Sequence, residues 1–150
     1  MPHSYSSSLF HVVFSTKDRR KIITKALQLR LWPYLGGIAR EHHTKALCIG
    51  GMEDHVHMLV SLPATLAIAK AVQLIKGGSS KWVSDTFREF HDFEWQEGYG
   101  AFSISISGVP DTVAYIENQE QHHRNETFEE EYIEFLNRHN IPFDPRYVFG

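Results

Sequence analysis

Two histidines separated by a single valine, His55 and His57, constrain this chain more than any other feature of its sequence. An apolar run over residues 58–62 follows them, and the glycine-containing segment 50–54 before them is typical of a turn. We therefore predict a β-strand, on which alternate side chains point to the same face. Both imidazoles can then bind one metal ion. Because a His-apolar-His strand is more often two partly exposed histidines, a third ligand and a reactive group have to be found elsewhere.

The segment 109–124 offers candidates for both the third ligand and the reactive group. Pro110 and Asp111 are typical of a helix start, since proline is tolerated in the first turn and an acidic side chain suits the positive end of the helix dipole. No glycine or proline follows before residue 125, so the pattern predicts one helix over 109–124. Residues three or four positions apart share a helix face. The polar side chains that this spacing places on one face are Tyr115, Gln119 and either His122 or His123.

Tyr115 admits two interpretations. Tyrosine on a helix is more often a packing residue than a catalytic one, and Gln119 taken alone is an ordinary surface amide. Beside a bound metal, however, a tyrosine can attack a phosphodiester covalently while the ion polarises the phosphoryl oxygens. Phenol has an unperturbed pKa of about 10, so a phenolate is also a good leaving group. A 3′ hydroxyl can therefore attack the tyrosine-linked phosphate later and rejoin the strand without ATP.

The pattern of apolar and polar residues predicts the remaining elements. They are a strand over 9–15, a helix over 24–42 capped by Thr24, a hairpin of strands over 44–49 and 55–62, a mostly helical segment over 66–90 that Gly77-Gly78 can interrupt, and a strand over 102–107. This βαββαβ order favours an α+β sandwich of the ferredoxin-like or RRM-like kind. We expect an antiparallel sheet with helices on one face, the histidine pair on a central strand, and the tyrosine-bearing helix after the sheet.

Composition predicts a single domain over residues 1–150. The chain is 42% hydrophobic and 13% aromatic, which is enough to bury a substantial core. No apolar run approaches the ~20 residues that cross a membrane, and the first residues have no signal-peptide pattern. The one cysteine, Cys48, excludes an internal disulfide and is consistent with a reducing compartment. Together these features predict a cytoplasmic protein.

Charge gives only local support for nucleic-acid binding. The net charge of −3 and the sequence pI near 6.3 are not those of a uniformly basic surface, so any contact with phosphates has to come from local groups. The alternative interpretation of both basic groups is an ordinary solvated surface. The candidates for DNA contact are Lys17, Arg19 and Arg20 near the N terminus, and Lys76 and Lys81 further along the chain.

Several stretches together make a family resemblance specific. The chain resembles the single-tyrosine HUH transposases of small insertion sequences, including their domesticated relatives associated with repetitive extragenic palindromes. The matching stretches follow one another in order over almost the whole chain, which makes coincidence a poor explanation. They are residues 11–17 (HVVFSTK), 54–60 (DHVHMLV), 75–81 (IKGGSSK), 98–103 (GYGAFS), 115–119 (YIENQ) and 122–124 (HHR).

The resemblance implies an enzyme that cuts single-stranded DNA at the hairpin-bearing ends of a mobile element. Tyr115 resembles the nucleophile that becomes linked to a 5′ phosphate and leaves a free 3′ hydroxyl. His55, His57 and Gln119 resemble the metal ligands, and the family ion is Mg²⁺ or Mn²⁺. Two imidazoles would suit zinc better, but an amide oxygen and a DNA phosphate favour a harder ion. His122 and His123 stand close enough in the sequence to be auxiliary ligands.

The resemblance also implies a homodimer in which the tyrosine helix docks against the metal site of the partner subunit. Glycines flank the strand before this helix, and Gly108 is the best candidate for a hinge. We therefore expect Tyr115 to act in trans. Three nearby aromatic residues, Trp95, Tyr99 and Phe102, could stack on unpaired bases, although aromatic residues at this density usually form core.

Three alternatives remain open. A nicking enzyme of replication or plasmid transfer is disfavoured by the short chain, which lacks helicase or primase regions. A non-catalytic nucleic-acid-binding protein with an RNA-recognition-like sheet would display aromatic and basic residues on that sheet. A metal-dependent phosphodiesterase in which Tyr115 is structural would form no covalent adduct with DNA. The tail 127–150 is predicted to hold a short amphipathic helix that packs over the sheet or at a dimer seam.

Overall fold

The chain folds around one four-stranded antiparallel sheet. The structure is a computed structural model that describes residues 4–150. Its strands and helices follow in the order β1 (Leu9–Ser15), α1 (Lys25–Glu41), β2 (Lys45–Gly51), β3 (His55–Ser61), α2 (Ile68–Thr86), β4 (Gly100–Ile104), α3 (Val109–Glu117), α4 (Gln119–His122) and α5 (Phe128–Arg138). Short 3-10 turns occupy Lys17–Arg19, Arg88–Phe90 and Ile106–Gly108. The predicted α+β class and βαββαβ order are confirmed.

The sheet places the histidine strand near its centre. The strand order is β2-β3-β1-β4, so β3 has a neighbour on each side. His57 lies opposite Val13 of β1 and Gly50 of β2. All the strand pairs are antiparallel, as expected. Since alternate residues of a strand point to opposite faces, His55 and His57 share one face and Val56 and Met58 share the other.

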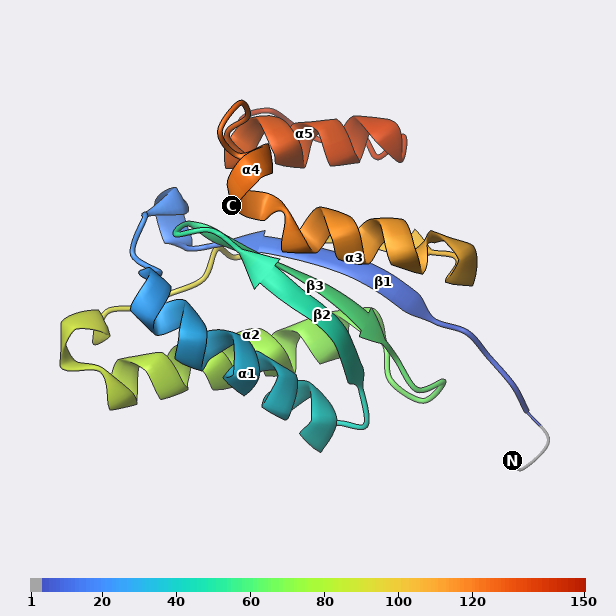
Figure 1. Ribbon diagram of the computed structural model, residues 1–150, viewed down its shortest axis with the longest axis horizontal. Helices are drawn as coiled ribbons and strands as arrows, with labels where there is room; N and C mark the ends of the chain where they lie inside the picture. Colours follow the sequence, from blue (N-terminus) through green and yellow to red (C-terminus); the bar gives the residue numbers. More distant parts are fainter. Residues whose placement is uncertain (1–3) are drawn as a thin grey trace.

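The face that carries Val56 and Met58 packs against α1 and α2. Val12 and Phe14 of β1 join them there, in a buried apolar cluster that includes Leu31 and other residues of both helices. Thr24 caps α1 as predicted, because its hydroxyl accepts a hydrogen bond from the backbone N–H of Leu27 at 3.2 Å. This layer supplies most of the apolar core on which the sheet rests (Figure 1).

The opposite face is covered as well. Figure 1 shows α3, α4 and α5 on the side of the sheet away from α1 and α2, which gives three layers. Val13 and Phe102 of the sheet form a second apolar cluster with Phe128, Tyr132 and other residues of α5. The two helices of the βαββαβ unit, α1 and α2, lie on one face as predicted, and the helices that follow the sheet cover the other. A helix over the tail 127–150 that packs over the sheet is confirmed, and a full capping box between Thr127 and Glu130 begins it.

Two glycine pairs behave differently from the prediction. Gly50 and Gly51 belong to β2 rather than to the turn, and a Cβ at Gly50 would lie 2.7 Å from the backbone oxygen of Ile116. This missing side chain lets α3 lie close against the sheet. Gly77 and Gly78 do not interrupt α2, which runs continuously through them. Gly78 instead faces Ile38 of α1 at close range, so Gly78 lets the two helices pack together.

Three boundaries also differ. The last strand starts at Gly100 and ends at Ile104, since residues 106–108 turn as a 3-10 helix. The predicted single helix over 109–124 is split at Asn118, where the backbone leaves the helical region (φ −101°, ψ 25°). The Asn118 side chain donates to the backbone oxygen of Ala114 at 2.9 Å, and such a local bond competes with regular helix geometry. Within the described residues, no helix is both long and apolar enough to cross a membrane.

Candidate active site

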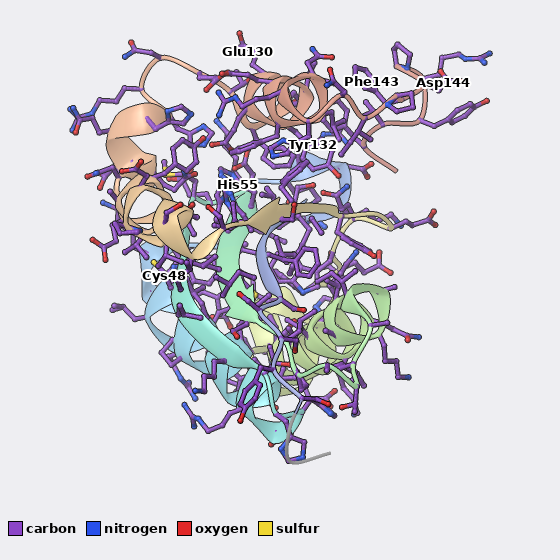
Figure 2. All side chains as sticks on the ribbon, turned by 90° about the vertical axis from the view of Figure 1, so that its right-hand side faces the viewer. Cys48, His55, Glu130, Tyr132, Phe143 and Asp144 are labelled. Carbon is purple, nitrogen blue, oxygen red and sulfur yellow. The ribbon has the colours of Figure 1, made fainter. Side chains whose placement is uncertain are left out.

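The histidine pair lies on the sheet side of a polar centre, between the sheet and the helices α3, α4 and α5. Both imidazoles are completely buried, and Figure 2 shows His55 between the sheet and α5. His55 is fixed by Asp54, whose carboxylate Oδ1 accepts its Nδ1–H at 2.7 Å. His57 is fixed by His11 of β1, whose Nε2 lies 2.7 Å from the His57 Nδ1 atom. Each Nδ1 atom thus has its own partner, and both Nε2 atoms point towards the upper helices.

Gln119 meets the pair from α4. Its side chain is buried, and its Oε1 atom lies 2.9 Å from His55 Nε2. The break at Asn118 changes how Gln119 follows Tyr115, because the two residues belong to separate short helices. The two side chains nevertheless lie close together, since the Tyr115 hydroxyl and Gln119 Nε2 both contact the Oε2 atom of Glu131.

The tyrosine belongs to the same centre. Tyr115 is half-buried on α3, and its ring centroid lies 5.7 Å from that of His57 in the same chain. Its hydroxyl lies 2.9 Å from His122 Nε2 and donates a hydrogen bond to the carboxylate of Glu131. Burial, together with the negative charge of Glu131, raises the pKa of Tyr115 above its ordinary value. The free tyrosine is therefore a neutral phenol at neutral pH.

The sequence did not distinguish His122 from His123 as auxiliary ligands, but the two histidines lie in different places. His123 joins the centre, with its Nε2 atom 3.0 Å from Gln119 Oε1, and its Nδ1–H donates to the backbone oxygen of Glu126 at 2.7 Å. His122 lies on the outer side beside the tyrosine, 2.6 Å from the Glu126 carboxylate. His123 therefore lies among the candidate metal ligands, whereas His122 lies next to the tyrosine hydroxyl.

Glu131 of α5 is the residue that the sequence interpretation missed. It is only 1% exposed, and its Oε1 atom lies 3.0 Å from His57 Nε2, while Oε2 accepts the Tyr115 hydroxyl. The ligand atoms of His55, His57, His123 and Glu131 all lie within 4.8 Å of one another. A signal was available: Glu131 falls between Phe128 and Phe135 on the apolar stripe of its helix, where an uncompensated carboxylate is unfavourable.

The charges in this centre are strongly interdependent. Burial lowers the pKa of His57 to about 4, against the opposing attraction of Glu131, so this imidazole is neutral at neutral pH. Burial alone would raise the pKa of Glu131, but His57, His123 and His55 around it reverse the effect and hold the pKa well below its usual range. A buried carboxylate among several imidazoles, with a phenol beside it, is an arrangement suited to holding a cation and a nucleophile together.

Two open grooves lead to the centre. One, of about 630 Å³, is lined by Tyr115, His122 and the amides of Asn118, Gln121 and Asn125. The other, of about 530 Å³, has a wall of mixed charge. Arg19, Lys21, Arg124 and His123 line it together with the carboxylates of Glu53, Asp54, Glu126, Glu129 and Glu130. Asn125 and Glu126 belong to both grooves. The tyrosine and the candidate ligands can therefore be approached from two sides.

The predicted DNA-contact residues are not gathered in one place. Lys17 and Arg20 follow β1 and face carboxylates of Glu94 and Asp92, at 3.1 Å and 3.4 Å. Arg19 alone among the five lines the second groove, where its Nε atom lies 3.9 Å from the Glu129 carboxylate.

Lys76 and Lys81 lie on α2, on the far side of the sheet from the histidines. Lys81 pairs with Asp85, and Lys76 donates to the backbone oxygens of Gln96 and Gly98 at 2.5 Å and 2.8 Å. Burial lowers the pKa of Lys76 to about 8, consistent with an interior, structural amine.

The aromatic residues suggested for base stacking are mostly core. Trp95 is 7% exposed and donates its indole N–H to Ser79 at 2.9 Å, and Phe102 is 2% exposed. For these two residues the stacking hypothesis was wrong, because the strand and turn around them bury the rings. Tyr99 is partly buried against the apolar cluster between the sheet and the helices α1 and α2.

Comparisons with known proteins agree on one family. Residues 4–119 match the family model described as "Transposase IS200 like". The chain is 24% identical over 115 residues to the ISDra2 transposase TnpA of Deinococcus radiodurans, and this match covers 73% of the chain and 82% of the relative. The matched family region contains the histidine pair, Tyr115 and Gln119, but ends before α5.

Two solved structures share the fold. One is a Deinococcus radiodurans R1 protein described as a transposase, with a TM-score of 0.63, 22% identity, and coverage of 78% of this chain and 94% of that one. The other is a REP-associated tyrosine transposase bound to a REP hairpin, with a TM-score of 0.61, 14% identity, and coverage of 81% and 72%.

Proposed function

Because the chain belongs to the IS200-like transposase family, we propose that it cuts and rejoins single-stranded DNA at hairpin-bearing ends through a covalent bond to Tyr115. The observation that carries this proposal is the position of the Tyr115 hydroxyl, which lies within the same buried centre as His57 and Gln119. A phenol placed beside a set of metal ligands is the arrangement that phosphodiester cleavage by a tyrosine requires.

The proposed step exchanges one phosphoester for another. The Tyr115 oxygen bonds to the phosphorus, the bond from phosphorus to the 3′ oxygen breaks, the phenol loses its proton, and the 3′ oxygen gains one. The products are a 5′-phosphotyrosine and a free 3′ hydroxyl, and the reverse reaction rejoins the strand. Glu131 and His122 hold the phenol oxygen in place before the reaction, through the hydrogen bond to Glu131 and the contact of 2.9 Å to His122.

The residues present fit a divalent ion. Nδ1–H of His55 and of His123 donates to an oxygen atom, so in the neutral rings both Nε2 lone pairs point towards Gln119 Oε1. Lone pairs that face an oxygen at 2.9–3.0 Å need a cation or extra protons between them. We propose His55, His57 and Gln119 as ligands of Mg²⁺ or Mn²⁺, and the imidazoles favour Mn²⁺. Such an ion supplies positive charge that polarises the phosphoryl oxygens.

The covered sheet argues against the RNA-recognition-like alternative. A protein of that kind stacks bases on aromatic side chains exposed on the sheet surface. Here α5 covers the face that carries the histidines, and both histidines are completely buried. Nucleic acid can instead reach the centre through the two grooves.

The proposal predicts a hairpin-dependent cut with a defined polarity. A solved structure that shares the fold holds a REP hairpin, and we carry that ligand class over to this chain as part of the proposal. Single-stranded oligonucleotides with and without a hairpin, labelled at either end, should be incubated with Mn²⁺ or Mg²⁺. We expect cleavage near the hairpin, a free 3′ hydroxyl on one product and protein attached to the 5′ end of the other. Cleavage that leaves both ends free would favour the metal-dependent phosphodiesterase alternative.

We predict that Arg124→Ala weakens DNA binding. Arg124 is exposed on the wall of the second groove, where it can neutralise a phosphate. Loss of one phosphate contact should reduce affinity several-fold and lower the salt slope of log K by about 1. Fluorescence anisotropy at several salt concentrations measures both quantities. Lys81→Ala is the matched control, because Lys81 lies on α2 behind the sheet and pairs with Asp85, so its removal should change binding less.

Tyr115 lies beside the histidines of its own chain, and we therefore predict that it acts in cis. The expectation from the sequence was that Tyr115 serves the partner subunit, but the structure brings it to the histidines of its own chain without any movement at Gly108. A mixture of Tyr115→Phe and His57→Gln proteins should therefore stay inactive even after subunit exchange. Exchange must be demonstrated separately, for example with two affinity tags. Recovered cleavage in the mixture would instead support the trans arrangement. The homodimer itself stays a prediction.

A further inference from the structure

The carboxylate of Glu131 is the one negative charge at the convergence point of three imidazoles. Its Oε1 atom lies 3.5 Å from His55 Nε2, 3.0 Å from His57 Nε2 and 3.2 Å from His123 Nε2. Metal ligands about 2.1 Å from an ion stand about 3.0 Å apart on adjacent octahedral positions and about 3.4 Å apart in a tetrahedron. The observed separations match both hydrogen-bonded pairs and ligand atoms of one coordination sphere, so the hydrogen positions decide between them.

Hydrogen bonds from neutral rings do not satisfy this arrangement. The Nδ1–H groups of His55 and His123 are already donated to oxygen atoms, so each neutral ring presents a lone pair, not a hydrogen, to Glu131. Two of the three contacts with Oε1 would then set a lone pair against a negatively charged oxygen. A cation at the centre of the group removes this conflict for both rings at once.

The burial of Glu131 leads to the same conclusion. The side chain is 1% exposed, and a buried carboxylate is costly unless a positive charge or a metal compensates it. In the part of the chain that the structure describes, its ion-pair partners are histidines, with no lysine or arginine among them. These partners carry no permanent positive charge, so a bound cation would compensate the carboxylate directly.

We propose that Glu131 is a metal ligand through Oε1, together with His123, and that its Oε2 atom holds the Tyr115 hydroxyl. The inference rests on the proposed metal-dependent function and extends it. The ligand set becomes richer in nitrogen and gains one negative charge from a helix that lies beyond the matched family region, 4–119. One carboxylate then joins the ion to the nucleophile, so the docking of α5 sets the distance between them.

Metal affinity tests this inference directly. Mn²⁺ titrations, followed by the electron paramagnetic resonance of the free ion, should be made on the full chain without DNA. Glu131→Gln keeps the shape and the ability to accept from His57 Nε2–H, but it removes the charge. We expect it to weaken Mn²⁺ binding at least about 10-fold. His123→Gln should weaken binding too, although less, because the lost ligand is uncharged.

Two controls separate coordination from general electrostatics. Glu130→Gln changes the neighbouring residue, whose side chain points away from the sheet in Figure 2 and whose capping role a glutamine can keep. Glu126→Gln removes a carboxylate near the centre that contacts His122 rather than the three converging imidazoles. We expect wild-type affinity for Glu130→Gln and at most a small loss for Glu126→Gln. A loss for Glu126→Gln as large as for Glu131→Gln would overturn the assignment of a ligand role.

The remaining outcomes are also decisive. Wild-type Mn²⁺ affinity in a folded Glu131→Gln protein would overturn this inference and leave the proposed function intact. If the wild-type protein itself binds no Mn²⁺ or Mg²⁺, the metal in the proposed function fails, and this inference fails with it. Thermal unfolding without metal checks the fold of each variant. If Glu131→Gln does not fold, Glu131→Asp keeps the charge but shortens the side chain, and undiminished Mn²⁺ affinity there would count against the ligand role.

Discussion

Replacing Tyr115 by phenylalanine should abolish DNA cleavage while DNA binding survives. The change removes one hydroxyl, which in the structure donates to Glu131 and lies beside His122, and leaves the ring packed against His57 and Phe135. Because this hydroxyl is the proposed nucleophile, we expect cleavage to fall by at least about 1,000-fold. Single-turnover cleavage of a labelled hairpin oligonucleotide measures the loss, and anisotropy measures binding.

The stability of this variant needs a separate check. Loss of a hydrogen bond to a charged, buried acceptor costs about 2 kcal/mol, so the midpoint of thermal unfolding should fall slightly without loss of the fold. Tyr132→Phe is the matched control, because Tyr132 is buried on α5 but packs among Phe102 and Phe128. That variant should cut DNA like the wild type. Normal cleavage by Tyr115→Phe would show that another group attacks the phosphate.

Replacing His57 by glutamine should remove metal binding and cleavage together. His57 is completely buried and lies between His11 and Glu131, so loss of its Nε2 atom removes a proposed ligand that no solvent-exposed group can replace. We expect Mn²⁺ affinity to fall by at least about 100-fold, the upper end of the losses seen when a supporting partner of a ligand is removed. Cleavage should become undetectable at metal concentrations that saturate the wild type. Isothermal titration and the oligonucleotide assay measure the two effects.

Glutamine is chosen at position 57 so that loss of metal binding does not simply reflect unpaired groups in the interior. An alanine would leave Glu131 and His11 without their partner in the interior, whereas the glutamine amide can still donate to Glu131. His139→Gln is the control, because His139 follows α5 and its Nδ1 contacts the backbone oxygen of Phe135 at 2.9 Å. Wild-type metal affinity in a folded His57→Gln protein would place the metal site elsewhere.

The sequence predicted well the parts of the fold that depend on local pattern. The strand over 9–15 agrees with β1, and Thr24 caps α1, because alternation and capping are properties of adjacent residues. The histidine pair on a central strand also followed from pattern and element order. The spacing of Tyr115 and Gln119 was a sufficient guide to their proximity, even though the helix breaks between them.

Features that depend on tertiary contacts could not be predicted in the same way. The break at Asn118 is a local feature, marked by the side-chain bond to Ala114, but an otherwise uninterrupted helical pattern conceals it. The role of Gly78 depends on its contact with Ile38, forty residues earlier in the chain. Glu131 belongs to an acidic segment that is typical of solvated surface. Only the docking of α5 on the sheet brings it to His57.

The central claim is that Tyr115 forms a covalent bond with DNA at this centre. The most direct test is to incubate the wild-type protein with a single-stranded hairpin oligonucleotide and Mn²⁺, denature the mixture, digest it, and identify the peptide that carries nucleotide mass. We predict a denaturation-resistant adduct whose modified residue is Tyr115, linked to a 5′ phosphate, and which is lost without metal. Cleaved DNA with no adduct, or an adduct on a different residue, would contradict the account.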